Sequence, residues 1–361
     1  MTPYAALIAA LVLCASCTAV PRHDCAPRDG HDFICGAQRP EDLARIPNTR
    51  WLVFSGFSDG AGLKLVDTRT REMRRWYGGS EAQLAFDSKR FEFCPSPPDP
   101  SLLNTQGLSL RTVGDAQHDL YVVNHGGRET IEIFRIDATQ DEPQIRWLGC
   151  IEMPAATPAN SVATYSDGTV LASVLTHPGT TITDFVRGAA TGGVYQWRPG
   201  EKGFRLLPGT RLPGNNGIET SADDREFYVV AFGWHAVVIY GRDDTSQPLR
   251  KAIAPGFMPD NIHWDGSRLI LAGMQLDEPA CGGTRKIVDG KADDMRCHRG
   301  YTVAALEPQT LEFTIVAYSQ PNAGFNGVSA ARVIDNELWL AAYQGDRIAV
   351  RALPGRSSSD D

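Results

Sequence analysis

The stretch RLPGNNGIETSADDREFYVVAFGWHAVVIY, residues 211–240, has the pattern that the rest of the chain repeats. A polar corner at 215–217 opens a short strand over 218–221, and the turn 222–224 leads to an alternating apolar run over 226–231. A second turn around Gly233 leads to another alternating run over 236–240. Short alternating runs separated by Gly and Asp turns predict one antiparallel sheet unit.

The same strand–turn–strand pattern occurs at six places along the chain. These places are 51–70, 120–137, 169–174 with 192–200, 226–243, 268–275 with 301–309, and 337–353. Their starts lie roughly 40 to 70 residues apart, which is the spacing of propeller blades. One blade cannot cover its own apolar faces, so the units are expected to pack radially around a channel. The sequence therefore predicts an all-β fold, a six-bladed β-propeller over residues 36–354 with a central metal site.

The bulk composition fits a single large domain with a sizeable core. The chain has 361 residues, of which 42% are hydrophobic and 22% charged, and closed all-β architectures of this length form one domain. The formal net charge is -8. An acidic chain lacks the electrostatic footprint of a nucleic-acid-binding protein, so we expect no nucleic-acid partner.

The N-terminal residues predict export. Residues 1–17 contain an apolar run over 4–13 that is too short to span a bilayer and has the length of a signal-peptide core. The sequence Cys14-Ala15-Ser16-Cys17 resembles the site that precedes a lipidated cysteine. Cys17 is therefore a candidate membrane anchor, with simple cleavage nearby as the alternative. We expect a periplasmic, membrane-anchored or secreted protein, with an N-terminal extension over 18–35 and a disordered tail over 355–361.

The remaining cysteines predict structural disulfides. Six cysteines remain, an even number that favours disulfide bonds in an exported chain, and no CxxC or zinc-binding spacing occurs among them. Proximity in the chain favours a bond between Cys281 and Cys297, which would close the Gly- and Asp-rich loop between them. The other pairs then follow by default as Cys25–Cys35 and Cys94–Cys150.

Each repeat is preceded by a shorter strand that polar residues open. The innermost strand of a propeller blade lines the axis, so these corners are expected to converge at one mouth of the channel. Together they offer two carboxylates and three amide oxygens, from Glu41, Asp260, Asn160, Asn216 and Asn261. A donor set made only of oxygens suits Ca²⁺, which takes about 6–8 such ligands in flexible geometry. Any single corner could be only a turn, but the recurrence favours a calcium site.

An ordered set of short segments resembles the paraoxonases. The segments are PEDL at 40–43, QGLSL at 106–110, LYVVNH at 120–125, NSV at 160–162, NGIETSADDREFYVV at 216–230 and PDNI at 259–262. Paraoxonases are calcium-dependent lactonases and arylesterases with a six-bladed propeller, related more distantly to the gluconolactonase and regucalcin group. The resemblance runs in the same order from about Glu41 to Val350.

The resemblance implies two calcium ions. It assigns the ligands of the catalytic ion to Glu41, Asn160, Asn216, Asp260 and Asn261. It assigns Asp42 and the carbonyl group of Leu108 to a second, structural ion. The position after Asn160 is acidic in the family but is Ser161 here, which puts the second ion in question.

A second departure concerns proton transfer. The family has a histidine pair near the metal, and His125 matches its outer member. The inner position is Gln106, and a glutamine side chain cannot accept a proton as a general base. We therefore expect Asp260 or Glu41 to activate the water, with His125 either relaying a proton or only lining the pocket. The family's disulfide between the two ends of the chain is also absent, because no cysteine follows Cys297, so strand pairing must close the ring.

Two further features concern the substrate pocket. His177 lies on the insertion of the third unit and is a candidate pocket residue beside Gln106, and 183–190 is the main candidate for a short helix. Ser58 fits a GxSxG motif, but an expected strand follows it where a serine hydrolase needs a helix. We interpret Ser58 as part of a hairpin turn.

The leading hypothesis is a calcium-dependent hydrolase that cleaves small-molecule lactones or aryl esters, a carboxylic ester hydrolase. One alternative is a sugar lactonase of the gluconolactonase type. Another is a non-catalytic exported propeller that binds a ligand or partner and keeps calcium for structure. Gln106 is the main argument for the non-catalytic alternative.

Overall fold

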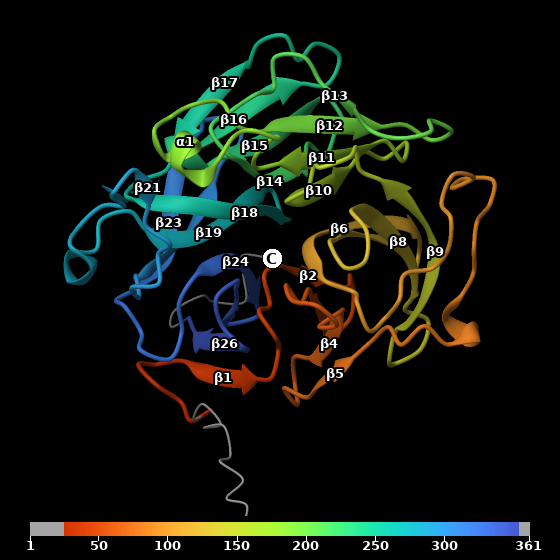
Figure 1. Ribbon diagram of the computed structural model, residues 1–361. Helices are drawn as coiled ribbons and strands as arrows, with labels where there is room; N and C mark the ends of the chain where they lie inside the picture. Colours follow the sequence, from red (N-terminus) through yellow and green to blue (C-terminus); the bar gives the residue numbers. More distant parts are fainter. Residues whose placement is uncertain (1–24, 354–361) are drawn as a thin grey trace, which may run out of the picture.

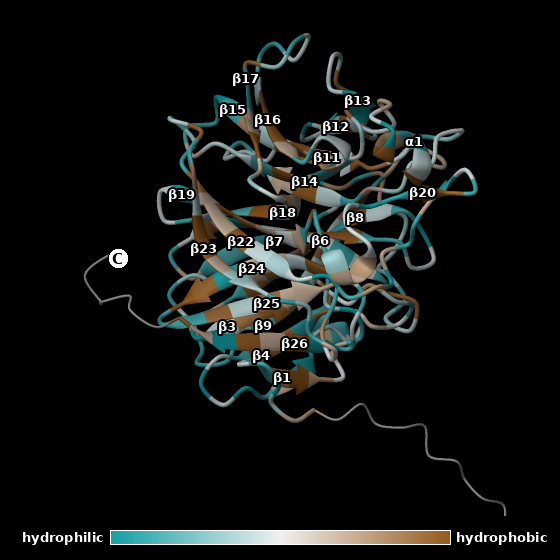
Figure 2. Ribbon diagram, turned by 90° about the vertical axis from the view of Figure 1, so that its left-hand side faces the viewer, coloured by the Kyte–Doolittle hydropathy of each residue, from teal (hydrophilic) through white to brown (hydrophobic). Residues whose placement is uncertain are grey.

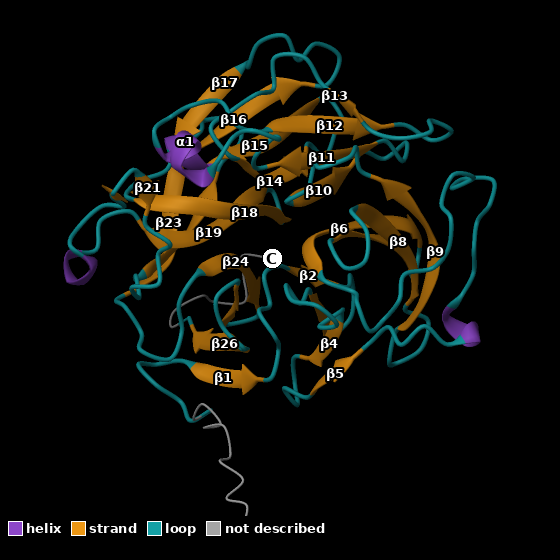
Figure 3. Ribbon diagram, in the orientation of Figure 1, coloured by secondary structure: helices purple, strands orange, loops and turns teal. Residues whose placement is uncertain are grey.

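The computed structural model describes residues 25–353, and its main feature is a ring of six four-stranded antiparallel sheets. Figure 1 shows the sheets arranged radially around a central axis, and Figure 3 shows how little helix lies between them. The predicted six-bladed β-propeller is confirmed. Within residues 211–240, the stretch that decides the fold, strands begin at Asn215, Glu226 and Ala236.

The blades follow one another along the chain, and the order of strands within each blade runs from the channel outward. Blades 1 to 3 are β2 (Leu43–Arg45), β3 (Trp51–Phe54), β4 (Lys64–Asp67) and β5 (Met73–Arg75); β6 (Thr105–Gly114), β7 (Gln117–Asn124), β8 (Thr130–Asp137) and β9 (Gln144–Glu152); β10 (Ser161–Thr164), β11 (Val170–Val174), β12 (Gly193–Trp197) and β13 (Arg205–Leu206). Blades 4 to 6 are β14 (Asn215–Thr220), β15 (Glu226–Ala231), β16 (Ala236–Gly241) and β17 (Arg250–Ile253); β18 (Phe257–Asp265), β19 (Arg268–Gln275), β22 (Tyr301–Leu306) and β23 (Phe313–Ser319); β24 (Val328–Ile334), β25 (Glu337–Ala342), β26 (Arg347–Ala352) and β1 (Asp32–Cys35).

Blade 6 closes the ring with strands from both ends of the described chain. β1 pairs antiparallel with β26, with Asp32 opposite Val350 and Cys35 opposite Arg347. Strand pairing therefore closes the ring, as expected from the absence of a cysteine after Cys297. Because β1 belongs to blade 6, the propeller begins before position 36, inside the range expected to be an extension.

Apolar side chains fill the space between neighbouring blades. Figure 2 shows the hydrophobic residues alternating with polar ones along the strands, as sheets packed face to face require. Where blade 6 meets blade 1, Leu43, Phe54, Trp339 and Ile348 are fully buried in one cluster. Burying such a side chain stabilises the fold by about 1.5–3 kcal/mol, so this contact strengthens the ring closure.

Three disulfide bonds form with the predicted pairing. They join Cys25 to Cys35, Cys94 to Cys150 and Cys281 to Cys297. Disulfides of this kind are typical of proteins that fold in an oxidising compartment outside the cytosol. Within residues 25–353, no helix has the length and apolar character needed to cross a membrane. The predicted signal segment, the candidate anchor Cys17 and the predicted tail lie outside the described residues.

Short helices and one small hairpin lie in the connections. The α-helix α1 (Ile182–Val186) is capped by Thr181, which forms a capping box with Asp184, and the helix is shorter than the predicted range 183–190. Two short strands, β20 (Ile287–Val288) and β21 (Lys291–Ala292), pair within the loop that the third disulfide closes. Other helical turns are η1 (Glu81–Gln83), η2 (Phe232–Trp234) and η3 (Pro279–Cys281).

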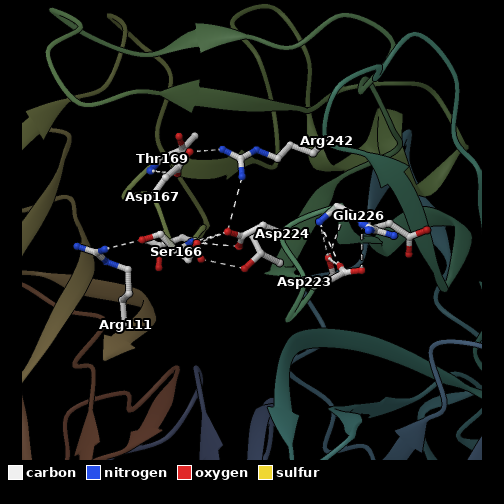
Figure 4. Close-up of polar contacts among 12 residues, drawn as sticks. Arg111, Ser166, Asp167, Thr169, Asp223, Asp224, Glu226 and Arg242 are labelled. Carbon is white, nitrogen blue, oxygen red and sulfur yellow. Dashed lines mark hydrogen bonds and ion pairs between the residues drawn. The ribbon is translucent and has the colours of Figure 1, made fainter. Parts of the chain in front are cut away.

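A polar network joins blades 2, 3 and 4 at the far ends of their inner strands (Figure 4). The Asp224 carboxylate, in the turn after β14, accepts hydrogen bonds from the backbone N–H of Ser166 at 3.1 Å and from its hydroxyl group. Arg111 donates to the carbonyl oxygen of Ser166 at 2.9 Å. Arg242 pairs with Asp167 and lies 3.8 Å from Asp224. This network lies at the opposite end of the inner strands from the predicted calcium corners.

Candidate metal centre

The candidate site is built on irregularities at the start of the inner strands. In β6, β14 and β18 the pairing with the neighbouring strand shifts at the polar corner, between Thr105 and Leu108, Asn215 and Ile218, and Pro259 and Ile262. Two residues there face one on the partner strand, which is a β-bulge. In a regular strand consecutive side chains point to opposite faces. The bulge in β18 therefore allows Asp260 and its neighbour Asn261 to serve the same site.

Glycines at two of these bulges allow adjacent blades to approach closely. A Cβ atom on Gly107 would lie 2.8 Å from the carbonyl oxygen of Asn160, and one on Gly217 would lie 2.4 Å from that of Asp260. A larger residue at either position would push the inner strands apart. These glycines therefore set the separation of the side chains at the mouth of the channel.

Four buried oxygen atoms at this mouth have no hydrogen-bond donor among the described residues. They are Glu41 Oε2, Asn160 Oδ1, Asn216 Oδ1 and Asn261 Oδ1, on side chains that are at most 8% exposed. The contact between two of these side chains keeps their other oxygen atoms free. The Asn261 amide nitrogen donates to Glu41 Oε1 at 3.0 Å, which leaves Asn261 Oδ1 and Glu41 Oε2 available. A buried polar atom without a partner costs about 1–3 kcal/mol, so four in one place indicate a ligand site.

The electrostatics of the site favour a cation. Burial, followed by the nearby Asp260 and Asp42, raises the pKa of the Glu41 carboxyl well above its usual range. Burial also raises the pKa of Asp260 to about 7, although a hydrogen bond from Asn216 partly offsets this rise. Two carboxylates close together out of water are both ionised only when a positive charge compensates them, and a bound cation would do this.

The donor set fits Ca²⁺. It combines the carboxylates of Glu41 and Asp260 with the amide oxygens of Asn160, Asn216 and Asn261, all of them buried near one mouth of the channel. Within residues 25–353, no group of three or more His, Cys, Asp or Glu side chains is arranged for a metal ion. The candidate ligands include no imidazole or thiolate, the groups that zinc prefers. Mixed carboxylate and amide oxygens are the ligands that calcium takes.

Four of the five candidate ligands, Glu41, Asn160, Asn216 and Asp260, line a cavity of about 350 Å³. Its walls are mainly apolar, from Phe57, Leu175, Ile182, Phe185, Phe232 and Met295, with Arg39, Arg285, Asp294 and Tyr343 also in the lining. Two insertions meet over it: Thr183 Oγ1 accepts a hydrogen bond from the backbone of Ala292 at 2.9 Å, and Arg285 lies over the ring of Phe185. No spacing in the sequence identifies these wall residues, because they come from loops of different blades.

Gln106 lines the cavity and separates His125 from the candidate ligands. The His125 Nε2 atom lies 2.8 Å from the Gln106 side-chain oxygen, and its Nδ1 atom lies 2.7 Å from the Glu129 carboxylate. Burial dominates the raised pKa of Glu41, and a hydrogen bond from the Gln106 amide acts against it by lowering that pKa. Both ring nitrogens of His125 are therefore engaged, and the histidine fixes the orientation of Gln106.

His177 does not line this cavity. It is 8% exposed, and its Nε2 atom lies 3.2 Å from the hydroxyl group of Tyr195 on β12. Burial, with a smaller contribution from Arg211, lowers its pKa. His177 is thus placed in the packing of blade 3 and away from the pocket in which it was expected.

The residues expected for a second ion are engaged with one another. The Asp42 Oδ2 atom accepts from the backbone N–H of Leu108 at 2.8 Å, and its Oδ1 atom accepts from that of Leu43 at 2.8 Å and lies 2.7 Å from His263 Nε2. Asp42 is fully buried and His263 is 5% exposed. Burial alone would lower the pKa of His263, but Asp42 raises it above its ordinary value. His263 was not among the predicted site residues, although it follows Asn261 by two positions and thus has the spacing of a residue on the same strand face.

Comparison with solved structures finds the same fold at low sequence identity. A luciferin-regenerating enzyme matches with a TM-score of 0.52 and 12% identity over 89% of this chain and 94% of that one. A provisionally assigned gluconolactonase matches with a TM-score of 0.51 and 13% identity over 91% of this chain and 96% of that one. The likeness is one of fold. No family model matches the chain, and no curated protein matches it significantly in sequence.

Proposed function

We propose that this protein is a calcium-dependent hydrolase of aryl esters or lactones that acts at the mouth of its central channel. One observation carries the proposal: buried carboxylate and amide oxygens without donors, from blades 1, 3, 4 and 5, lie at one mouth of the channel, where Glu41, Asn160 and Asn216 line a cavity. The calcium ligands on this proposal are Glu41, Asn160, Asn216, Asp260 and Asn261. A calcium ion bound there polarises a carbonyl oxygen and offsets the negative charge that develops on it.

Asp260 is the proposed general base. Asp260 is buried and lines the cavity beside the other candidate ligands, so its carboxylate is placed next to a water molecule held there. The carboxylate takes a proton from a water molecule as the water oxygen bonds to the carbonyl carbon. When the bond to the leaving oxygen breaks, the protonated Asp260 returns that proton to the leaving alkoxide or phenoxide. Glu41, which accepts from Asn261 at 3.0 Å, serves as a ligand.

Gln106 and His125 position groups in this proposal. A glutamine amide at the inner position donates to Glu41 and neither gains nor loses a proton. His125 stabilises the orientation of that amide through its contact at 2.8 Å, and Glu129 orients His125 in turn. Substitution of His125 is expected to weaken calcium binding more than it changes the pH profile of turnover.

The cavity walls favour apolar substrates over sugars. Phe57, Phe185 and Phe232 present aromatic surface, and a volume of about 350 Å³ admits a small ester or lactone. A sugar lactone is the second candidate, since one of the proteins with this fold is described as a provisional gluconolactonase. Apolar side chains outnumber the polar Arg39, Arg285, Asp294 and Tyr343 on the walls, which disfavours it, because some buried sugar hydroxyl groups would lose their hydrogen-bond partners.

The test is an assay of purified protein on phenyl acetate, alkyl-substituted γ- and δ-lactones and a sugar δ-lactone, with calcium and then with chelator. We expect chelator-sensitive turnover that is greatest on the apolar substrates. Asn216→Ala should lower turnover by at least about 100-fold. Asp223→Asn, a change in an exposed turn, is the matched control and should behave like the unchanged protein. The hydrolase proposal fails if none of these substrates turns over in a calcium-dependent way.

A further inference from the structure

A buried carboxylate and a buried histidine, Asp42 and His263, lie directly beneath the candidate calcium centre. Asp42 follows the ligand Glu41 in the chain, and His263 follows the ligand pair on β18. Leu108 and His263 line the cavity at the other mouth of the channel, whereas Gln106 and Asp260 line the cavity above. The Asp42–His263 pair thus separates the two mouths.

This is the position at which the paraoxonase resemblance implies a structural metal ion, and the residues present do not fit one. All the donors that Asp42 needs come from the protein, namely two backbone N–H groups and the His263 ring at 2.7–2.8 Å. Leu108 presents its N–H to Asp42. Ser161, at a position that is acidic in the family, brings no charge and accepts a hydrogen bond at its carbonyl oxygen from Ser173.

Side chains of other blades also occupy the space around the pair. His263 lies 2.7 Å from Asp42 and 3.8 Å from Glu219 of β14, so its ring stands between two carboxylates. Arg332 of β24 faces the same two carboxylates and also donates to the carbonyl oxygen of Trp264. The Asp42 and Glu219 carboxylates therefore already face nitrogen-bearing side chains of the protein, and a metal ion at Asp42 would have to displace the His263 ring.

We propose that the His263 side chain takes the place of the second metal ion, so that this protein binds one calcium ion and none at Asp42. Like an ion, the ring connects inner strands of different blades: Asp42 precedes β2, Glu219 lies on β14 and His263 on β18. The count of one ion rests on the proposed function of the upper site. The exclusion of metal from Asp42 rests only on the contacts that Asp42 and His263 make.

The first experiment counts calcium in the native protein by elemental analysis after gel filtration. We expect one ion per chain, and none in Asn216→Ala. Two ions per chain, with one lost in Asp42→Asn, would overturn the inference and leave the proposed hydrolase intact. No ion in the native protein would instead contradict the proposed function, and the inference would then be decided by the unfolding experiment.

The unfolding experiment compares His263→Ser with the double variant His263→Ser, Ser161→Asp. The single variant should lose thermal stability, and calcium should not restore it. The double variant gains a carboxylate at the position that is acidic in the paraoxonases and loses the histidine, so it should bind one ion more than native protein and unfold at a higher temperature with calcium than without. If His263→Ser unfolds at the native temperature with chelator present, the ring does not replace an ion and the inference is wrong.

Discussion

Glu41 and Asp42 are consecutive carboxylates with nearly equal burial, 2% and 0% exposed, and their surroundings are opposite in kind. Glu41 has one oxygen without a donor, and burial together with its acidic neighbours raises its pKa. Asp42 accepts three hydrogen bonds, one of them from a histidine ring. Because side chains alternate along an extended chain, one residue serves the upper cavity and the next serves the layer below.

The comparison distinguishes two kinds of buried carboxylate. Asp42 is paired within the protein, whereas Glu41 keeps an oxygen free for a ligand. A carboxylate that the protein has paired contributes to stability only while its partner is present. A carboxylate without a partner costs stability until a cation binds, and binding then stabilises the folded state. The two residues should therefore respond in opposite directions to the same loss of charge.

Asp42→Asn should give the largest change in stability. It removes the anion that faces His263 and leaves a buried ring without its partner, so unfolding free energy should fall by about 3–5 kcal/mol. Chemical denaturation with chelator, and again with saturating calcium, measures this fall. Equal losses in both conditions are expected, since calcium does not bind at Asp42. A loss that calcium abolishes would mean that Asp42, like Glu41, is a metal ligand.

Glu41→Gln should act in the opposite direction. The raised pKa of Glu41 means that its ionisation destabilises the metal-free fold, and glutamine does not ionise. With chelator, we expect the variant to be more stable than native protein by about 1–3 kcal/mol at pH 7. With calcium the order should reverse, because the native protein gains binding energy and the variant has lost a ligand. Differential scanning calorimetry in both conditions decides the point.

The pH dependence of the metal-free protein should identify Asp260. Its pKa rises from 3.8 to about 7 on folding, so between these values the folded state keeps a proton that the unfolded chain has released. Stability present at low pH is therefore lost as the pH rises from about 4 to about 7. Calcium needs the ionised form, so its affinity should fall below pH 7 by about tenfold per pH unit for one proton displaced. Calorimetric titration at pH 6 and pH 7.5 tests this, and Asp260→Asn should weaken the dependence on pH in the chelated protein and leave the part that Glu41 contributes.

A substitution in the polar network of Figure 4 should change stability least, and it serves as a control for the other substitutions. Asp224 is paired but partly exposed, with 23% of its side chain accessible. Asp224→Asn keeps the shape of a residue with φ of 60° and removes the charge, so we expect a loss of at most about 1 kcal/mol. Calcium affinity should not change. A loss of stability as large as that of Asp42→Asn would mean that burial does not explain why the Asp42 pair should matter more for stability than the Asp224 pair.

Much of this fold could be predicted because its signals are local. Alternating runs and Gly or Asp turns set each blade, and the six corners recur at similar places within the repeats. The candidate ligands Asn160 and Asn216 follow from that recurrence, which needs no knowledge of distant contacts. The ring closure also followed from a simple fact, the lack of a cysteine after Cys297.

The remaining features depend on contacts between distant segments. Arg285 and Phe185 share a wall of the cavity only because two loops meet over it. The sequence could not predict the contact between His263 and Asp42, because the two residues lie 221 positions apart. The place of His177 could not be predicted for the same reason, because its packing against Tyr195 depends on how the insertion folds back on blade 3.

The pairing of β1 with β26 has a consequence for how the chain matures. Residues that pair at the start and end of the described chain, such as Asp32 and Val350, give the topology a high contact order, so the last step of folding must wait for the last strand to be made. Until then the outer edge of blade 6 and the inner face of blade 1 are open to aggregation and proteolysis. A chain that lacks β26 would therefore be exposed to degradation even if its first five blades are intact.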